Sequence, residues 1–236
     1  MSGLSIDEPV DNVPSAFSDV VFEAFAARPG HRFTLVLSGG PTARACYETL
    51  AEAATGLLIG AIDWTLVDIY MGDERLVPPD DPDANQRLVR ETLIEHVGPV
   101  GSFTPMPTVG PVEECVAAYQ QLMRVVLDGP GIDLIHLGVG GDGHTASLFP
   151  GDPTLDAGPD QLVAATEDAN GVNPHPRLTL TLPAINAARC AVFTVTGQAK
   201  HEAVAALRRG EDRPAARVAA QKVIWLVDDL AFGHAP

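Results

Sequence analysis

The residues best suited to chemistry stand in one glycine-rich stretch, Gly138–Gly151, which follows an apolar run at Ile132–Leu137. It contains one acid, Asp142, and one imidazole, His144. A neutral imidazole can act as a general base near neutral pH, so His144 is the candidate catalytic residue. Asp142 could either orient His144 or only accept hydrogen bonds from N–H groups of the loop. Four glycines let chain and ligand approach closely around the imidazole: Gly138, Gly140, Gly141 and Gly143.

A second group of residues could bind a phosphate. A predicted strand at Phe33–Leu37 runs into Gly39 and Gly40, and a predicted helix at Ala43–Ala54 follows. The free N–H groups and dipole of such a helix N-terminus suit an anion, and Thr42 stands directly before the predicted helix. The same pattern is also typical of a plain tight turn between a strand and a helix.

Three cationic side chains could help to bind an anionic substrate or to support the loop. Arg75 follows the carboxyl end of a predicted strand at Trp64–Tyr70, where ligands of parallel sheets gather. Lys200 lies in the first turn of a predicted helix, where a cation opposes the helix dipole unless an anion binds there. Arg177 could contact substrate or brace the loop, and bracing is the preferred interpretation.

The letters of the glycine-rich stretch also fit a dinucleotide-binding turn, with Gly138, Gly140 and Gly143 in register. That turn must open directly into a long helix, and Pro150 and Pro153 leave little room for one. A nucleotide site is therefore rejected.

The remaining elements would have to position these side chains. Apolar periodicity predicts helices around 17–25, at Ala84–His96 and at Val112–Leu127, and short helical turns at Pro183–Arg189. Further strands are predicted at Gln161–Thr166, Pro174–Leu182, Ala191–Thr196 and Val223–Val227. Alternating strands and helices indicate an α/β fold, with a mostly parallel Rossmann-like sheet between two helical layers.

Composition limits the classes of partner. The 236 residues carry a net charge of −16, which disfavours nucleic acid and anionic membranes. An anionic ligand must therefore be attracted by local cations. Three widely spaced cysteines indicate small core residues rather than disulfides or a thiolate metal site. No apolar run reaches the roughly 18 residues of a membrane span. We expect a single cytoplasmic domain over residues 1–236.

In order along the chain, these motifs resemble those of the 6-phosphogluconolactonases, within the sugar-phosphate isomerase and deaminase superfamily. The resemblance covers most of the chain and rests on the segments 37–40, 73–79 with Asn85, 142–150, 176–183, and 196–197 with Lys200. It implies hydrolysis of 6-phosphoglucono-1,5-lactone to 6-phosphogluconate in the oxidative pentose phosphate pathway, without a cofactor. It also implies that His144 is the general base and that Gly39, Gly40, Arg75 and Lys200 surround the phosphate.

The chain departs from the family pattern at Pro41, which removes one N–H group from the phosphate loop, and at Gln86, where the family usually has tyrosine. The nearest rival is a glucosamine-6-phosphate deaminase, whose pattern has a glutamate where this chain has Phe149. A sensor that binds sugar phosphates without turnover is the rival from another class. The expected partner is a phosphorylated sugar lactone, acted on by a monomer or small homo-oligomer with no metal site.

Overall fold

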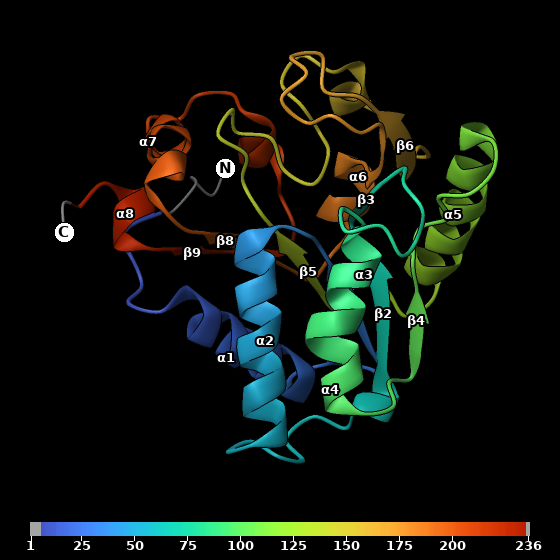
Figure 1. The fold of residues 1–236 in the computed structure, drawn as a ribbon, viewed down its shortest axis with the longest axis vertical. Coiled ribbons are helices and arrows are strands. Elements are labelled where there is room, and N and C mark those ends of the chain that lie inside the picture. The colour runs from blue at the N-terminus through green and yellow to red at the C-terminus, as the bar shows by residue number, and fades with distance from the viewer. Residues whose placement is uncertain (1–5, 235–236) are drawn as a thin grey trace.

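A six-stranded parallel sheet forms the centre of the computed structural model, which describes residues 6–234 (Figure 1). The strands lie in the order β4-β2-β1-β5-β8-β9. Their bounds are β1 Phe33–Leu37, β2 Val67–Met71, β4 Ser102–Thr104, β5 Leu134–Leu137, β8 Cys190–Val195 and β9 Lys222–Val227. The predicted parallel α/β sheet is confirmed. Residues 1–5 and 235–236 of the expected single domain lie outside the described residues.

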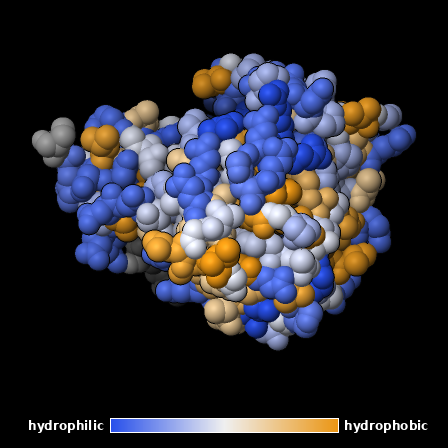
Figure 2. All heavy atoms as spheres, turned by 60° about the horizontal axis from the view of Figure 1, so that its bottom comes forward, coloured by the Kyte–Doolittle hydropathy of each residue, from blue (hydrophilic) through white to orange (hydrophobic). Residues whose placement is uncertain are grey.

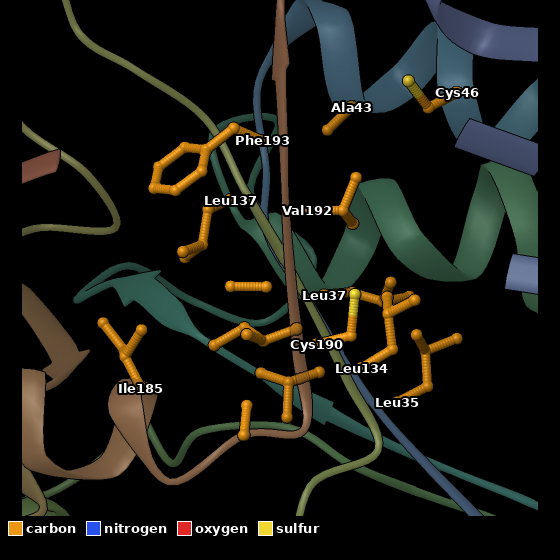
Figure 3. Packing of buried hydrophobic residues seen from close by; sticks show 14 of the residues in the cluster. Leu35, Leu37, Ala43, Cys46, Leu134, Leu137, Ile185, Cys190, Val192 and Phe193 are labelled. Atoms are coloured by element: carbon orange, nitrogen blue, oxygen red, sulfur yellow. The ribbon is translucent and has the colours of Figure 1, made fainter. Parts of the chain in front are cut away.

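Helices cover both faces of this sheet. The described helices are α1 Val13–Ala26, α2 Pro41–Thr55, α3 Asn85–Val89, α4 Glu95–Val97, α5 Val112–Asp128, α6 Leu182–Asn186, α7 His201–Arg208 and α8 Asp229–Phe232. The helices α1, α2 and α3 lie in front of the sheet in Figure 1. Figure 3 views β8 from close by, with Ala43 and Cys46 of α2 on one side and Ile185 of α6 on the other. The central strands are therefore buried on both faces, which explains why β1, β5 and β8 are apolar apart from one buried polar residue each, Thr34, His136 and Thr194.

A second, antiparallel sheet was not predicted. It has the order β3-β7-β6, with β3 Asp73–Arg75, β7 Arg177–Leu180 and β6 Val163–Thr166. Gly72 joins it to the large sheet, because its N–H donates to Leu37 O and its carbonyl accepts from Leu180 N, both at 2.8 Å. Arg75 is thereby fixed on a strand beside Arg177, its partner in the β3–β7 register, rather than on the loop that the sequence suggested.

Local departures from the predicted bounds have identifiable causes. Residues Trp64–Leu66, expected to begin a strand, form a 3₁₀ turn because the Asp63 carboxylate accepts from the Thr65 N–H at 3.1 Å. The predicted helix at Ala84–His96 is present but contains a π-helical turn at Arg90–Ile94. The strands β3 and β4 and the short helix α8 were missed.

The core is one cluster of apolar side chains that includes the three cysteines. Figure 3 shows part of this cluster, with Cys46 and Cys190. Cys46, Cys115 and Cys190 are free and buried, as predicted. Burial raises the pKa of the Cys46 thiol to about 12 despite a hydrogen bond with Thr194. Burial also raises the pKa of the Cys190 thiol, against the opposing charge of Lys222.

The two ends of the sheet differ. The carboxyl ends of β2 and β4 and the N-terminus of α2 point to the top of Figure 1, where the loop after β5 also lies. The C-terminus of α2 lies at the opposite end, followed by a turn that exposes Leu57 and Ile59. Figure 2 brings that end forward and shows hydrophobic residues gathered between hydrophilic ones. Among the described residues, no helix is long and apolar enough to cross a membrane.

Candidate active site

His144 and Asp142 form a close pair in the loop that follows β5. The carboxylate oxygen Oδ1 of Asp142 lies 2.6 Å from Nδ1 of His144 and also accepts from the His144 backbone N–H at 3.0 Å. Burial raises the pKa of Asp142, but these two hydrogen bonds outweigh it and the pKa is lowered to about 2. An ionised carboxylate can only accept, so Nδ1 carries the proton and Nε2 is left as the free base. The sequence left two roles open for Asp142, orienting His144 or accepting hydrogen bonds from N–H groups of the loop, and its contacts are consistent with both.

Two of the four loop glycines are required by this pair. A Cβ on Gly140 would lie 2.1 Å from His144 Nδ1 and 2.6 Å from Asp142 Oδ1, so only glycine leaves room for both side chains. The loop is closed by the Gly140 N–H donating to His144 O at 2.8 Å. Gly143 has a φ of 86°, a conformation that favours glycine. At Gly138 and Gly141 a Cβ would meet no protein atom closer than 3.8 Å, so no contact within the protein requires glycine at these two positions.

One cavity of about 240 Å³ lies at the carboxyl ends of β1, β2, β5 and β8. All the predicted site residues except Asp142 line it: Gly39, Gly40, Thr42, Arg75, His144, Arg177 and Lys200. Asp142 contacts the cavity only through His144. The fold thus brings together side chains that are separated in the sequence by up to 161 residues, from Gly39 to Lys200.

The N-terminus of α2 forms one wall of this cavity. Gly40 precedes the helix with a φ of 102°, and Pro41 occupies its first position, where a missing N–H group costs no helical hydrogen bond. The next two residues, Thr42 and Ala43, line the cavity. The hydroxyl of Thr42 lies 2.7 Å from the hydroxyl of Thr196, which ties α2 to the end of β8. Pro41 therefore does not disturb the first turn of α2.

Three cations face the cavity in different settings. Lys200 is half-buried, and burial lowers its pKa while the charge of Asp142 opposes that shift. Arg75 is held by a hydrogen bond from Nη1 to Asp83 O at 2.7 Å. Arg177 is buried, with Nη1 3.7 Å from Asp73 Oδ2 and Nη2 donating to Asn173 Oδ1 at 3.2 Å. These contacts agree with the bracing interpretation of Arg177, although it also lines the cavity.

A buried histidine, His136, also lines the cavity and was not singled out from the sequence. His136 lies on β5, with Nδ1 2.8 Å from the hydroxyl of Tyr47 and Nε2 2.7 Å from that of Thr194. The Ser38 N–H donates to the same tyrosine oxygen at 3.0 Å. Burial lowers the pKa of His136 to about 3, so the ring is neutral. Its sequence signal was a histidine inside the mostly apolar run Ile132–Leu137, which also contains Asp133.

A second missed group is Glu74, whose carboxylate is fully buried between β3 and α3. It accepts from three backbone N–H groups, those of Arg75 at 2.8 Å and of Asn85 and Gln86 at 2.7 Å each. Burial raises its pKa to about 7 although these bonds act in the opposite direction. Glu74 thus joins the strand that carries Arg75 to the first turn of α3. The Gln86 side chain is buried, and nothing in the structure explains its replacement of tyrosine.

Several known proteins are similar to this chain in sequence and in fold. A family model described as "Glucosamine-6-phosphate isomerases/6-phosphogluconolactonase" matches residues 7–225. The 6-phosphogluconolactonase of Synechocystis sp. is 37% identical over 210 residues, which cover 84% of this chain and 82% of that protein. The structure of 6-phosphogluconolactonase from Thermotoga maritima has a TM-score of 0.79 at 28% identity and covers 94% of this chain and 97% of its own. The enzyme of that name from Trypanosoma brucei has a TM-score of 0.80 at 26% identity, covering 98% and 97%.

Proposed function

Because the chain belongs to the glucosamine-6-phosphate isomerase and 6-phosphogluconolactonase family, we propose that it hydrolyses 6-phosphoglucono-1,5-lactone to 6-phosphogluconate. The observation that carries the reaction chemistry is the His144–Asp142 pair, in which a carboxylate holds Nδ1 of an imidazole that lines a cavity with three cations. Hydrolysis of a lactone needs an activated water and a proton for the leaving oxygen, and one imidazole can serve both steps.

In the proposed mechanism, Nε2 of His144 takes a proton from water while the water oxygen attacks the lactone carbonyl. The tetrahedral intermediate then collapses, the bond from the carbonyl carbon to the ring oxygen breaks, and the imidazolium returns its proton to that oxygen. Asp142 stabilises the imidazolium, because its charged oxygen lies 2.6 Å from Nδ1. General base catalysis of this kind contributes about 10²–10⁴-fold. No covalent bond to the protein is needed.

The substrate phosphate would occupy the end of the cavity formed by Gly39, Gly40, Thr42, Arg75 and Lys200. This end combines the N-terminus of α2 with two cations, in a chain whose net charge is −16. Binding at this end would hold the lactone carbonyl near His144 and make the reaction effectively unimolecular. We expect Lys200→Met to raise KM at least about tenfold, because a phosphate partner worth about 1.4 kcal/mol or more is removed.

The aromatic residue next to His144 supports the lactonase over the deaminase. Phe149 is 2% exposed and its ring centroid lies 4.9 Å from that of the imidazole. The deaminase pattern has a glutamate at this position, and a phenyl ring cannot transfer a proton. We also propose that the chain forms one cytoplasmic domain over 1–236. It would act on a phosphorylated sugar lactone as a monomer or small homo-oligomer.

The test is product formation by the purified protein. Freshly prepared lactone is supplied, and 6-phosphogluconate is measured above the spontaneous rate, in parallel with ammonia release from glucosamine 6-phosphate. We expect acceleration with the lactone only, and a loss of about 10²–10⁴-fold in His144→Ala. His31→Ala, at an exposed histidine outside the cavity, is the matched control. Binding without turnover would favour the sensor, and full activity in His144→Ala would exclude this histidine as the base.

A further inference from the structure

Asn85 is a buried amide in the wall of the cavity and has no role in the mechanism above. It is the first residue of α3, lies beside β3 (Figure 1) and is 1% exposed. Its backbone N–H donates to Glu74 Oε1 at 2.7 Å. Its side-chain Nδ2 donates to Asp73 O at 2.9 Å and lies 3.3 Å from Asp73 Oδ1. Asn85 is therefore fixed to β3, the strand that also carries Arg75.

The other side-chain atom of Asn85 faces the opposite wall. Because Nδ2 must donate to Asp73, Oδ1 points away from β3, and among the described residues it has no hydrogen-bond partner. Oδ1 lies 1.7 Å from the position that a Cβ on Gly39 would occupy, and Cγ lies 2.3 Å from it. The amide of Asn85 therefore packs directly against the Cα of Gly39.

This contact explains why residue 39 is a glycine. The φ of Gly39 is outside the left-handed region, in contrast to that of Gly40 at 102°. A residue with a Cβ could adopt the backbone conformation of Gly39, so the requirement for glycine comes from the neighbouring amide and not from the backbone. Asn85 and Gly39 form a steric lock between β3 and the loop that leads into α2.

We propose that Asn85 is a positioning residue for the substrate phosphate, which sets the separation between the α2 N-terminus and Arg75. The inference rests on the proposed function, because it concerns the phosphate end of the same cavity. A phosphate can be bound from both sides only if the amides after Gly39 and the guanidinium of Arg75 are held at the right distance. Asn85 contacts both walls and so fixes that distance.

The test is a double-mutant cycle with Gly39→Ala and Asn85→Ala. Gly39→Ala alone must displace the amide or the loop, so we expect kcat/KM to fall about 10²-fold. Asn85→Ala alone should raise KM about tenfold and change kcat less than about threefold, because catalytic groups stay in place. In the Asn85→Ala background, Gly39→Ala should cost less than about threefold, since the colliding atoms are gone. Gly30→Ala, where a Cβ meets only Arg32 O at 3.8 Å, is the control and should be neutral in both backgrounds.

A second measurement separates this inference from the proposed function. Calorimetric dissociation constants for inorganic phosphate and for 6-phosphogluconate, with the Tm of each variant, report on the lock without turnover. If Gly39→Ala weakens phosphate binding in the wild type but not in the Asn85→Ala background, the contact between the two residues is supported even if the wild type does not hydrolyse the lactone. Losses that multiply independently, or no phosphate binding by the wild type, would overturn it. If Asn85→Ala does not fold, Asn85→Ser replaces it in the cycle with the same expected rescue.

Discussion

Gly140→Ala tests the geometry of the candidate base in one substitution. The added Cβ would lie 2.1 Å from Nδ1 and 2.2 Å from Cε1 of His144, against the 3.4 Å or more of an ordinary contact. The imidazole must therefore move by more than about 1 Å, and the 2.6 Å hydrogen bond to Asp142 must break. A misplacement of that size costs about 10²-fold in rate. The protein should still fold, because the half-buried ring can swing outward at a cost of about 1–3 kcal/mol.

The assay is kcat/KM for lactone hydrolysis, together with urea unfolding of each variant. The matched control is Gly141→Ala, the next residue, whose Cβ would lie 3.8 Å from Ala199 O and which does not line the cavity. We expect Gly141→Ala to keep wild-type activity. Gly140→Ala with activity within twofold of wild type would refute the proposed dependence on the His144–Asp142 geometry, and equal losses in both variants would show that the loop backbone matters instead.

Two further predictions concern charge. Asp142→Asn keeps an oxygen that can accept from both N–H groups of His144 but loses the negative charge, so kcat/KM should fall about tenfold. Asp142→Ala also loses both hydrogen bonds, so kcat/KM should fall about 10²-fold. A larger loss in Asp142→Asn than in Asp142→Ala would contradict the orienting role of Asp142. The pKa of His136 is lowered to about 3 in the folded state from 6.5, so the folded state binds fewer protons at this residue than the unfolded state does. His136 therefore contributes to the free energy of unfolding at neutral pH. This contribution decreases by about 1.4 kcal/mol per pH unit as the pH falls below 6.5. The unfolding free energy of wild type relative to His136→Asn, from urea titrations, should therefore be about 2 kcal/mol smaller at pH 5 than at pH 7, whereas a constant difference would show that His136 is not held neutral. Glu74 titrates in the opposite sense but is common to both proteins, so it cancels in this comparison.

Five of the six strands of the large sheet could be predicted because they are mostly apolar runs; the sixth, β4, is only three residues long and was missed. The strand Phe33–Leu37 was predicted with its observed bounds, since four of its five residues are apolar and it lies between the polar Arg32 and Ser38. The strand β3 could not be found in this way, because Asp73, Glu74 and Arg75 are charged. They are tolerated in a buried strand only because distant groups satisfy them, such as the N–H groups of α3 that bind Glu74.

The residues of the candidate site could be predicted where a sequence motif forms a loop. They could not be predicted where a residue makes its contacts between two secondary-structure elements. The glycine-rich segments identified His144, Gly39 and Gly40, and their shared cavity agrees with that interpretation. Family membership, predicted from the same motifs, is confirmed by the family model over residues 7–225. The contacts of Asn85 with Asp73 and Gly39 depend on how β3 and α2 meet, which no local pattern records.

The burial of the three cysteines makes the native chain a ready background for site-specific labelling. Thiol reagents attack the thiolate, and Cys46 and Cys190 have raised pKa values in addition to being shielded. A single new cysteine on an exposed loop, such as Val172→Cys next to the cavity-lining Asn173, would therefore react before the native ones under mild conditions. An environment-sensitive fluorophore at that position would report directly on ligand entry, without removing Cys46, Cys115 or Cys190 from the core.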